Sequence, residues 1–213
     1  MPIIWFIRHA ESETNVGLPT ASPLTAQLTP AGREQARSIA HAFTTPPQLI
    51  ITSPYLRTKQ TAEFTSQRFP AARVEEWPVH GFTYLSQSLG PEPSTIAERR
   101  VLVDAYWERL DHLYTDGDGA ESFTEFMQRV QHVLDQLKNA DENLIAVYSH
   151  GQFILAVLSR LMGSIIDNMG QFKHFRMAHE IPNGAIMMTD LRASGEVWFS
   201  PFITSHLPPS SQS

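Results

Sequence analysis

The sequence contains no cysteine, little basic charge and no long hydrophobic run. Without cysteine there can be no disulfide bond or thiolate metal site, and this composition fits the cytoplasm, where thiols stay reduced. The formal net charge of −6 indicates no basic face for nucleic acid or for an anionic membrane surface. The densest apolar stretch, residues 153–162, is interrupted by Ser159 and Arg160 and is too short to span a bilayer. We therefore expect neither nucleic acid nor a membrane as a partner.

The remaining composition is that of an ordinary globular protein. Hydrophobic residues make up 42% of the 213 positions and charged residues 18%. A chain of this length can bury a substantial core, and it is most simply one domain. We predict a single domain over residues 1–204, and a disordered tail over the Pro/Ser-rich residues 205–213.

Three short apolar runs each end in a polar cluster. Residues 3–7 are followed by Arg8 and His9, residues 49–52 by a segment that ends in Arg57, and residues 144–148 by Ser149 and His150. Continuous apolar runs of this length are typical of buried parallel strands, and ligands of such sheets sit outside the carboxyl ends of the strands. If the three strands lie side by side, two histidines and two arginines meet at one edge. The pattern predicts a site for an anion.

The segments between these runs are helical in period, which gives an alternating α/β order. Thr29-Pro30 and Ser53-Pro54 each look like a helix cap followed by proline at the first helical position. Helices are expected at residues 30–43, 53–69, 96–114, 122–138 and 152–162. A short strand is expected at residues 73–77, and a late strand pair at 184–191 and 196–202.

The two residue types expected at this edge suit phosphoryl chemistry. A guanidinium group presents a planar fork of donors to phosphate oxygens, so Arg8 and Arg57 could neutralise most of a phosphate dianion. An imidazole can attack phosphorus and form a covalent intermediate. A second imidazole, protonated, would stabilise charge on the transition-state oxygens. A leaving alkoxide also needs a proton, which a nearby carboxylic acid would supply.

Five segments, in order, resemble the signatures of the histidine phosphatase superfamily, also called phosphoglycerate mutase-like. Residues 8–15 read Arg-His-Ala-Glu-Ser-Glu-Thr-Asn, and the others are residues 28–36, 53–62, 119–122 and 148–151. The resemblance implies a three-layer α/β sandwich, with a mostly parallel central sheet and helices on both faces. It also implies a phosphohistidine mechanism without a cofactor. By residue match, His9 would be the nucleophile, and the phosphoryl contacts would come from Arg8, Arg57, His150, Asn15 and Gln152.

The chain departs from the family pattern at the general acid. The family's glutamate is expected to fall at Gly81, which has no side chain, and Ala10 replaces the glycine usual after the first histidine. Glu76 is the nearest substitute as general acid, followed by Glu75 and His80. If no acid is available, phosphate esters with poor leaving groups would react slowly.

The sequence predicts no metal site. It has no His-Glu-x-x-His pattern, and the segment 116–119 resembles a calcium loop but lacks the later ligands, because Met127 stands at position twelve. The arginines would neutralise the charge that Mg²⁺ neutralises elsewhere, so activity should not need a divalent ion.

Three classes of function remain open. The first is a phosphatase acting on a small phosphate monoester, with inorganic phosphate and other oxyanions as competing ligands. The second is a cofactor-dependent phosphoglycerate mutase, which the short spacing of 92 positions between Arg57 and His150 disfavours. The third, suggested by Gly81, is a phospho-ligand binding or regulatory module with little turnover. Residues 77–120 and 172–182 would set specificity, and the late strand pair could form a homodimer.

Overall fold

The computed structural model describes residues 2–20, 22–86, 95, 97–163, 168–191 and 197–209. Within them, six strands form one sheet in the order β3-β2-β4-β1-β5-β6. The strands are β1 (Ile3–Arg8), β2 (Leu49–Thr52), β3 (Arg73–Glu76), β4 (Leu144–Ser149), β5 (Ile186–Leu191) and β6 (Val197–Phe199). β1 to β4 are parallel, whereas β5 and β6 pair antiparallel at one side. The three expected strands therefore lie side by side, with β4 between β2 and β1.

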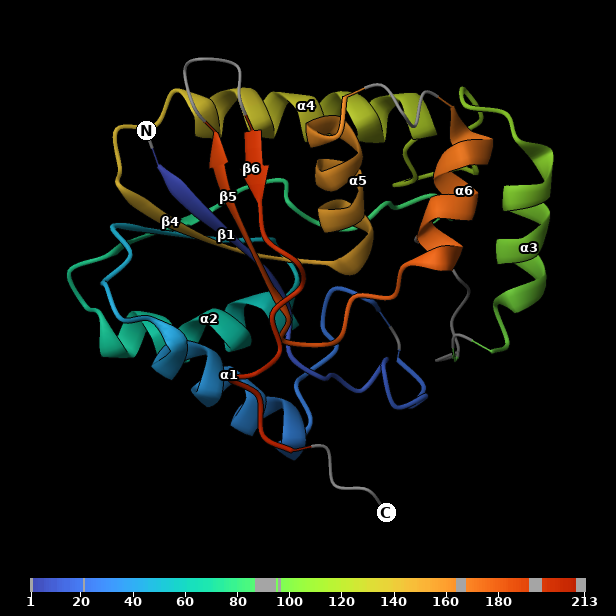
Figure 1. Cartoon of the computed structure of the whole chain (residues 1–213). Coiled ribbons are helices and arrows are strands. Elements are labelled where there is room, and N and C mark those ends of the chain that lie inside the picture. Colours follow the sequence, from blue (N-terminus) through green and yellow to red (C-terminus); the bar gives the residue numbers. More distant parts are fainter. Residues whose placement is uncertain are drawn as a thin grey trace.

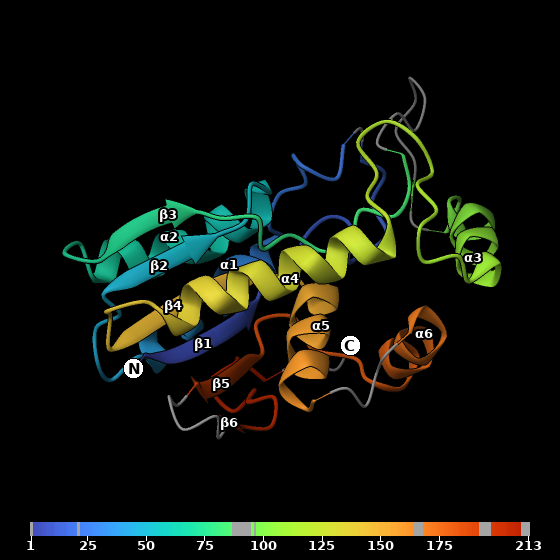
Figure 2. The ribbon, with the colours of Figure 1, turned by 90° about the horizontal axis from the view of Figure 1, so that it is seen from above.

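Helices cover both faces of this sheet and give three layers (Figure 1). The helices are α1 (Pro30–Ala42), α2 (Leu56–Arg68), α3 (Arg100–Arg109), α4 (Phe123–Lys138), α5 (Gly151–Leu161) and α6 (Met169–Ala178). α1 and α2 lie on one face and α4 and α5 on the other, while α3 and α6 stand beyond one end of the sheet (Figure 2). None of the helices in the described ranges is long and apolar enough to cross a membrane.

Side chains along each strand alternate between the two faces of the sheet, so the core consists of an apolar cluster on each face. Ile4 and Phe6 of β1 belong to the larger apolar cluster, which α4 and α5 complete. Ile7 of the same strand belongs to the apolar cluster on the opposite face. That cluster includes Ile39 of α1 and Phe43, the residue directly after α1. Successive side chains of a strand point to opposite faces, so a strand covered on both faces must be apolar throughout. This is why the strands read as continuous apolar runs.

Of the two helix caps expected, the one at Thr29 is present and the one at Ser53 is not. Thr29 Oγ1 accepts a hydrogen bond from the Gly32 N–H at 3.0 Å, directly before Pro30. Ser122 forms a full capping box at the start of α4. The expected cap at Ser53 is wrong, because α2 begins at Leu56 and the Ser53 hydroxyl is used elsewhere.

Two further expectations need correction, and one helix was missed. The helix expected over 96–114 is shorter, because Leu110 adopts a left-handed conformation (φ 52°) that ends α3. α6 was not expected. The predicted tail is ordered at its start: Leu207 packs against the cluster beside α1, and His206 Nε2 donates to the Gly184 carbonyl at 3.0 Å. Positions 210–213, and the turn expected at 193–195, lie outside the described residues.

Candidate active site

The ends of β1 and β4 bring two histidines together. The His9 N–H donates to the Ser149 carbonyl at 2.9 Å, which continues the pairing of the two strands past Arg8. His150 follows Ser149 and precedes the first turn of α5. The ring centroids of His9 and His150 are 5.0 Å apart, and each residue is only 5% exposed. Strand order alone therefore produces the pair that the sequence led us to expect.

The loop after His9 is held against the first turn of α1. The Thr29 N–H donates to the Glu11 carbonyl at 3.1 Å. A Cβ added to Gly32 would stand 2.0 Å from that same carbonyl oxygen, a distance no side chain tolerates. Glycine at position 32 thus lets the helix approach the backbone that carries His9.

Asn183 fixes the His9 backbone from the other side. Its Nδ2 donates to the His9 carbonyl at 3.0 Å, and the next residue, Gly184, donates its N–H to the Arg8 carbonyl at 3.1 Å. Gly184 has φ +76°, a conformation that glycine adopts without strain. The sequence analysis missed Asn183, because its short turn before β5 carries no recognisable motif.

The hydrogen bonds of His9 define which ring nitrogen is free to react. His9 Nδ1 lies 2.8 Å from the Ala10 carbonyl, so Nδ1 carries the proton. Arg57 Nε donates to His9 Nε2 at 3.1 Å, so Nε2 keeps its lone pair. Burial, then the charges of Arg57 and Arg8, hold the pKa of His9 well below its usual value. His9 is therefore a neutral imidazole with Nε2 available as a nucleophile.

His150 is oriented by Arg57 and Ser53. Arg57 Nη2 donates to His150 Nδ1 at 3.0 Å, and His150 Nε2 donates to Ser53 Oγ at 2.8 Å. Burial, followed by the charge of Arg57, lowers the pKa of His150 well below its usual value. Ser53 directly follows β2, so the rule that predicted Arg57 at this edge could also have found Ser53.

The two arginines reach this edge without a counter-ion. Arg57 Nη1 donates to the Pro23 carbonyl at 2.6 Å, and burial lowers the pKa of Arg57 to about 10. Arg8 Nη1 donates to the Ile181 carbonyl, while Arg8 Nε is buried without a hydrogen-bond partner. In the part of the chain that the structure describes, neither forms an ion pair with a carboxylate. Buried, unpaired cations favour binding of an anion.

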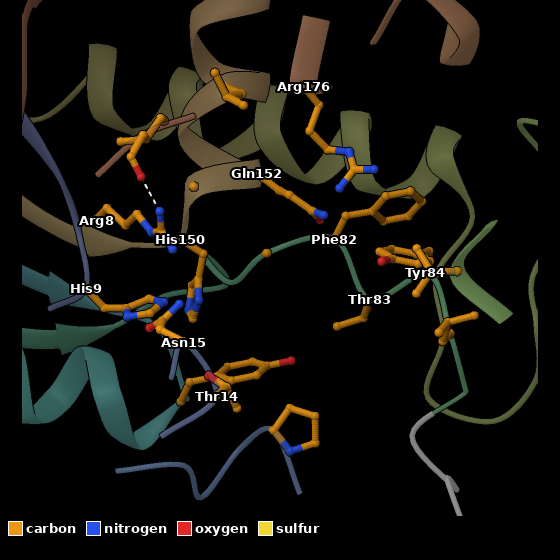
Figure 3. Close-up of a pocket in the computed structure, with 18 of the residues that line it drawn as sticks. Arg8, His9, Thr14, Asn15, Phe82, Thr83, Tyr84, His150, Gln152 and Arg176 are labelled. Carbon is orange, nitrogen blue, oxygen red and sulfur yellow. Dashed lines mark hydrogen bonds between the residues drawn. The ribbon is translucent and has the colours of Figure 1, made fainter. Parts of the chain in front are cut away.

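A cavity of about 630 Å³ opens over these groups. Arg8, His9 and His150 lie together at one end of it (Figure 3). Asn15 also lines it: its Oδ1 accepts from the Ser12 N–H at 3.0 Å and from Asn183 Nδ2 at 3.2 Å, which leaves its NH₂ group free to donate to a ligand. The structure thus brings together six of the seven predicted residues: Arg8, His9, Asn15, Arg57, His150 and Gln152.

The seventh, Glu76, lies elsewhere. It ends β3, which β2 and β4 separate from β1 in the sheet, and it pairs with Lys59 Nζ at 2.7 Å while its side chain is 52% exposed. It does not line the cavity, and Glu75 is likewise turned away, toward Arg73 and the Trp77 ring nitrogen. The expectation that Glu76 supplies the proton is therefore corrected: an edge strand leaves its carboxylates to solvent and to neighbouring cations.

Gly81 occupies the place expected for the acid. It lines the cavity beside His150, and a Cβ added to it would lie 3.5 Å from the His150 Cβ. Among the described residues that line the cavity, Glu180 is the acidic one, and its charge acts on Arg8. No set of three or more described histidine, aspartate or glutamate side chains could hold a metal ion.

Comparisons with known proteins identify the family of this chain. A family model described as histidine phosphatase superfamily (branch 1) matches residues 4–181. A Hydrogenobacter thermophilus protein provisionally named phosphoserine phosphatase 2 is 27% identical over 173 residues, which are 79% of this chain and 83% of that protein.

Solved structures show the same fold. A provisionally assigned alpha-ribazole-5'-P phosphatase of Escherichia coli K-12 matches with a TM-score of 0.75 and 20% identity over 98% of this chain and 100% of that one. The phosphoserine phosphatase of Entamoeba histolytica, in complex with 3-phosphoglyceric acid, matches with a TM-score of 0.69 and 22% identity, at the same coverage of both chains. With the family model spanning most of its length, the chain belongs to branch 1 of the histidine phosphatase superfamily.

Proposed function

We propose that this protein is a phosphatase that hydrolyses a small phosphate monoester through a phosphohistidine on His9. The observation that carries the proposal is the state of His9 Nε2. Its lone pair accepts a hydrogen bond from Arg57 Nε at the end of the cavity where neither Arg57 nor Arg8 forms an ion pair with a described carboxylate. A neutral nucleophile facing two cations is suited to attack a phosphoryl group whose charge those cations neutralise.

In the first step, His9 Nε2 attacks phosphorus while the ester P–O bond breaks, and the alcohol oxygen leaves as an oxyanion that takes a proton from solvent water. The Nδ1 proton remains on His9 and is held by the Ala10 carbonyl. Arg57 lies 3.1 Å from His9 Nε2 and 3.0 Å from His150 Nδ1, so phosphoryl oxygens would take over its donors as the substrate binds. The N-terminus of α5, beside Gln152, adds partial positive charge.

In the second step, water attacks phosphorus and the P–N bond breaks. Inorganic phosphate leaves and His9 returns to its neutral state with its lone pair. Arg8 and Arg57 bind the phosphoryl oxygens in both steps, because charge spreads over the same oxygens in each transition state. His150 joins them once its Nδ1 takes up a proton, which the negative charge of the bound phosphoryl group would favour. The arginines provide the neutralisation for which other phosphoryl-transfer enzymes use Mg²⁺.

Turnover of an aryl phosphate in EDTA tests the proposal. We expect release of p-nitrophenol from p-nitrophenyl phosphate to continue at an undiminished rate when EDTA is present, and vanadate to compete with the substrate. Strict dependence on a divalent ion would contradict the mechanism. Formation of 2-phosphoglycerate from 3-phosphoglycerate with 2,3-bisphosphoglycerate would instead identify a mutase.

Gly81 has no side chain that could protonate the leaving oxygen of an alkyl ester, so we expect alkyl esters to react more slowly than aryl esters. A Gly81→Glu variant tests this, because a Cβ at this position meets only ordinary contacts, the nearest being His150. A positioned acid contributes about 10²–10⁴-fold to turnover, so even an imperfectly aligned carboxyl group should raise the alkyl-to-aryl rate ratio by about tenfold. Gly81→Ala is the control for the added volume. A ratio unchanged from wild type would show that the missing carboxyl group does not limit alkyl esters.

A further inference from the structure

The cavity has more positive charge than a phosphoryl group requires. Its described lining residues include four arginines, Arg8, Arg57, Arg99 and Arg176, against the single acidic Glu180, in a chain whose formal net charge is −6. Arg57 donates a hydrogen bond to His9 Nε2, and Arg8 directly precedes His9 in the chain. Arg176 stands at the opposite end, where its guanidinium group points into the cavity past Gln152 (Figure 3). This positive charge is therefore arranged in two places.

Arg176 is held in place but is not neutralised. It lies on α6, and its guanidinium carbon is 4.7 Å from the centre of the Trp107 ring, which fixes the plane of the group. Its Nε is buried without a hydrogen-bond partner, and no carboxylate of the described chain pairs with it. A buried donor without a partner costs free energy, and a ligand that accepts from it would remove that cost.

Arg99 adds a second charge at this end. Its Nε donates to the Thr95 carbonyl at 3.2 Å, and it too lacks an ion pair with a described carboxylate. Tyr84, Arg99 and Arg176 line the same cavity, and the charges of the two arginines oppose the increase that burial causes in the pKa of Tyr84. Two like charges that line one cavity repel each other, and an anion bound between them would remove that repulsion.

We infer that the substrate carries a second anionic group on its leaving alcohol, and that Arg176, with Arg99, binds it at the end of the cavity away from His9. The inference rests on the proposed phosphatase function and names its substrate class: phosphate monoesters of an alcohol that bears a carboxylate or a second phosphate. Either group accepts two parallel hydrogen bonds from the edge of a guanidinium group. Phe82 and Tyr84 would contact the carbon chain between the two anions.

Three pairs of phosphate esters test this inference. In each pair, one ester carries a second anionic group and the other lacks it. The pairs are 3-phosphoglycerate and glycerol 3-phosphate, 6-phosphogluconate and sorbitol 6-phosphate, and fructose 1,6-bisphosphate and fructose 6-phosphate. The first two pairs probe a carboxylate at two distances, and the third probes a phosphate. The ratio of kcat/KM within each pair is measured for wild type, Arg176→Gln and Arg176→Lys. Arg100→Gln serves as the control, because Arg100 is 76% exposed, pairs with Asp104 and does not line the cavity.

We expect at least one pair to show a preference of about 10- to 100-fold for the doubly anionic ester, the range of charge-assisted hydrogen bonds. Arg176→Gln should bring that ratio close to one, Arg176→Lys should retain part of it, and Arg100→Gln should leave it as in wild type. The inference is overturned if no pair shows a preference, or if Arg176→Gln preserves it.

A failure of the proposed function can be told apart from a failure of this inference. If neither the esters nor p-nitrophenyl phosphate is hydrolysed, the phosphatase proposal fails. Calorimetric titration of the same pairs into the wild-type chain and the Arg176→Gln variant then decides the inference. The inference is supported if the wild-type chain binds the doubly anionic ester more tightly and Arg176→Gln loses this difference. Equal binding of the two esters by the wild-type chain contradicts it.

Discussion

Replacing His9 by alanine is expected to lower kcat for p-nitrophenyl phosphate by about 10⁴–10⁶-fold, the range seen when a nucleophile is removed from a catalytic unit. The reason is that Nε2 of His9 holds the lone pair, while Arg57 donates to both His9 and His150. Radiolabel from a ³²P-labelled ester, quenched in alkali to preserve phosphohistidine, should remain on the wild-type chain and be absent from His9→Ala.

His132 provides the control, because it is an exposed histidine on α4. His132→Ala should retain full turnover and labelling. Labelling of His9→Ala at the wild-type level would place the phosphoryl group on another residue and contradict the role assigned to His9.

Replacing Arg57 by alanine should lower kcat by about 10²–10³-fold, the usual cost of losing one preorganised donor to the transition state. Arg57 is the group that reaches both His9 and His150, so its removal also releases both rings. Arg57→Lys should recover little of the rate, because an ammonium group cannot donate to two acceptors in the fixed planar geometry of a guanidinium group.

Thermal unfolding separates this effect from a folding defect. Burial lowers the pKa of Arg57 to about 10, which means that its charged form is less favourable in the folded protein than in the unfolded chain. Losing that charge offsets the loss of its hydrogen bonds, so the Tm of Arg57→Ala should stay near the wild-type value. The exposed Arg100→Ala provides the comparison. A large decrease in Tm, specific to Arg57→Ala, would assign the lost rate to unfolding.

The sequence was sufficient for the central part of the fold. Residues 3–7, 49–52 and 144–148 are apolar throughout because both faces of these strands are covered, and local composition reports that directly. The residues that follow the carboxyl ends of neighbouring parallel strands then lie at one edge of the sheet. His9 and His150 come together for this reason, although 140 positions separate them.

Residues whose role depends on a distant partner could not be assigned in this way. Ser53 and Pro54 have the local form of a helix start, yet the Ser53 hydroxyl faces His150 Nε2 at 2.8 Å, a contact 97 positions away in the chain. Asn183 supports His9 from a turn without a motif. Glu76 was close enough in sequence to be considered the acid, but the edge position of β3 turns it toward Lys59.

The sequence by itself determined the strands, their polar ends and the residue types of the phosphoryl site, because apolar runs and the residues that follow them are local features of the sequence. Only the tertiary structure decided which nitrogen of His9 is free, which carboxylates are absent from the cavity and where Arg176 points. Those properties depend on which side chains meet across the fold. The contact of Arg176 on α6 with Trp107, for example, cannot be predicted from either segment alone.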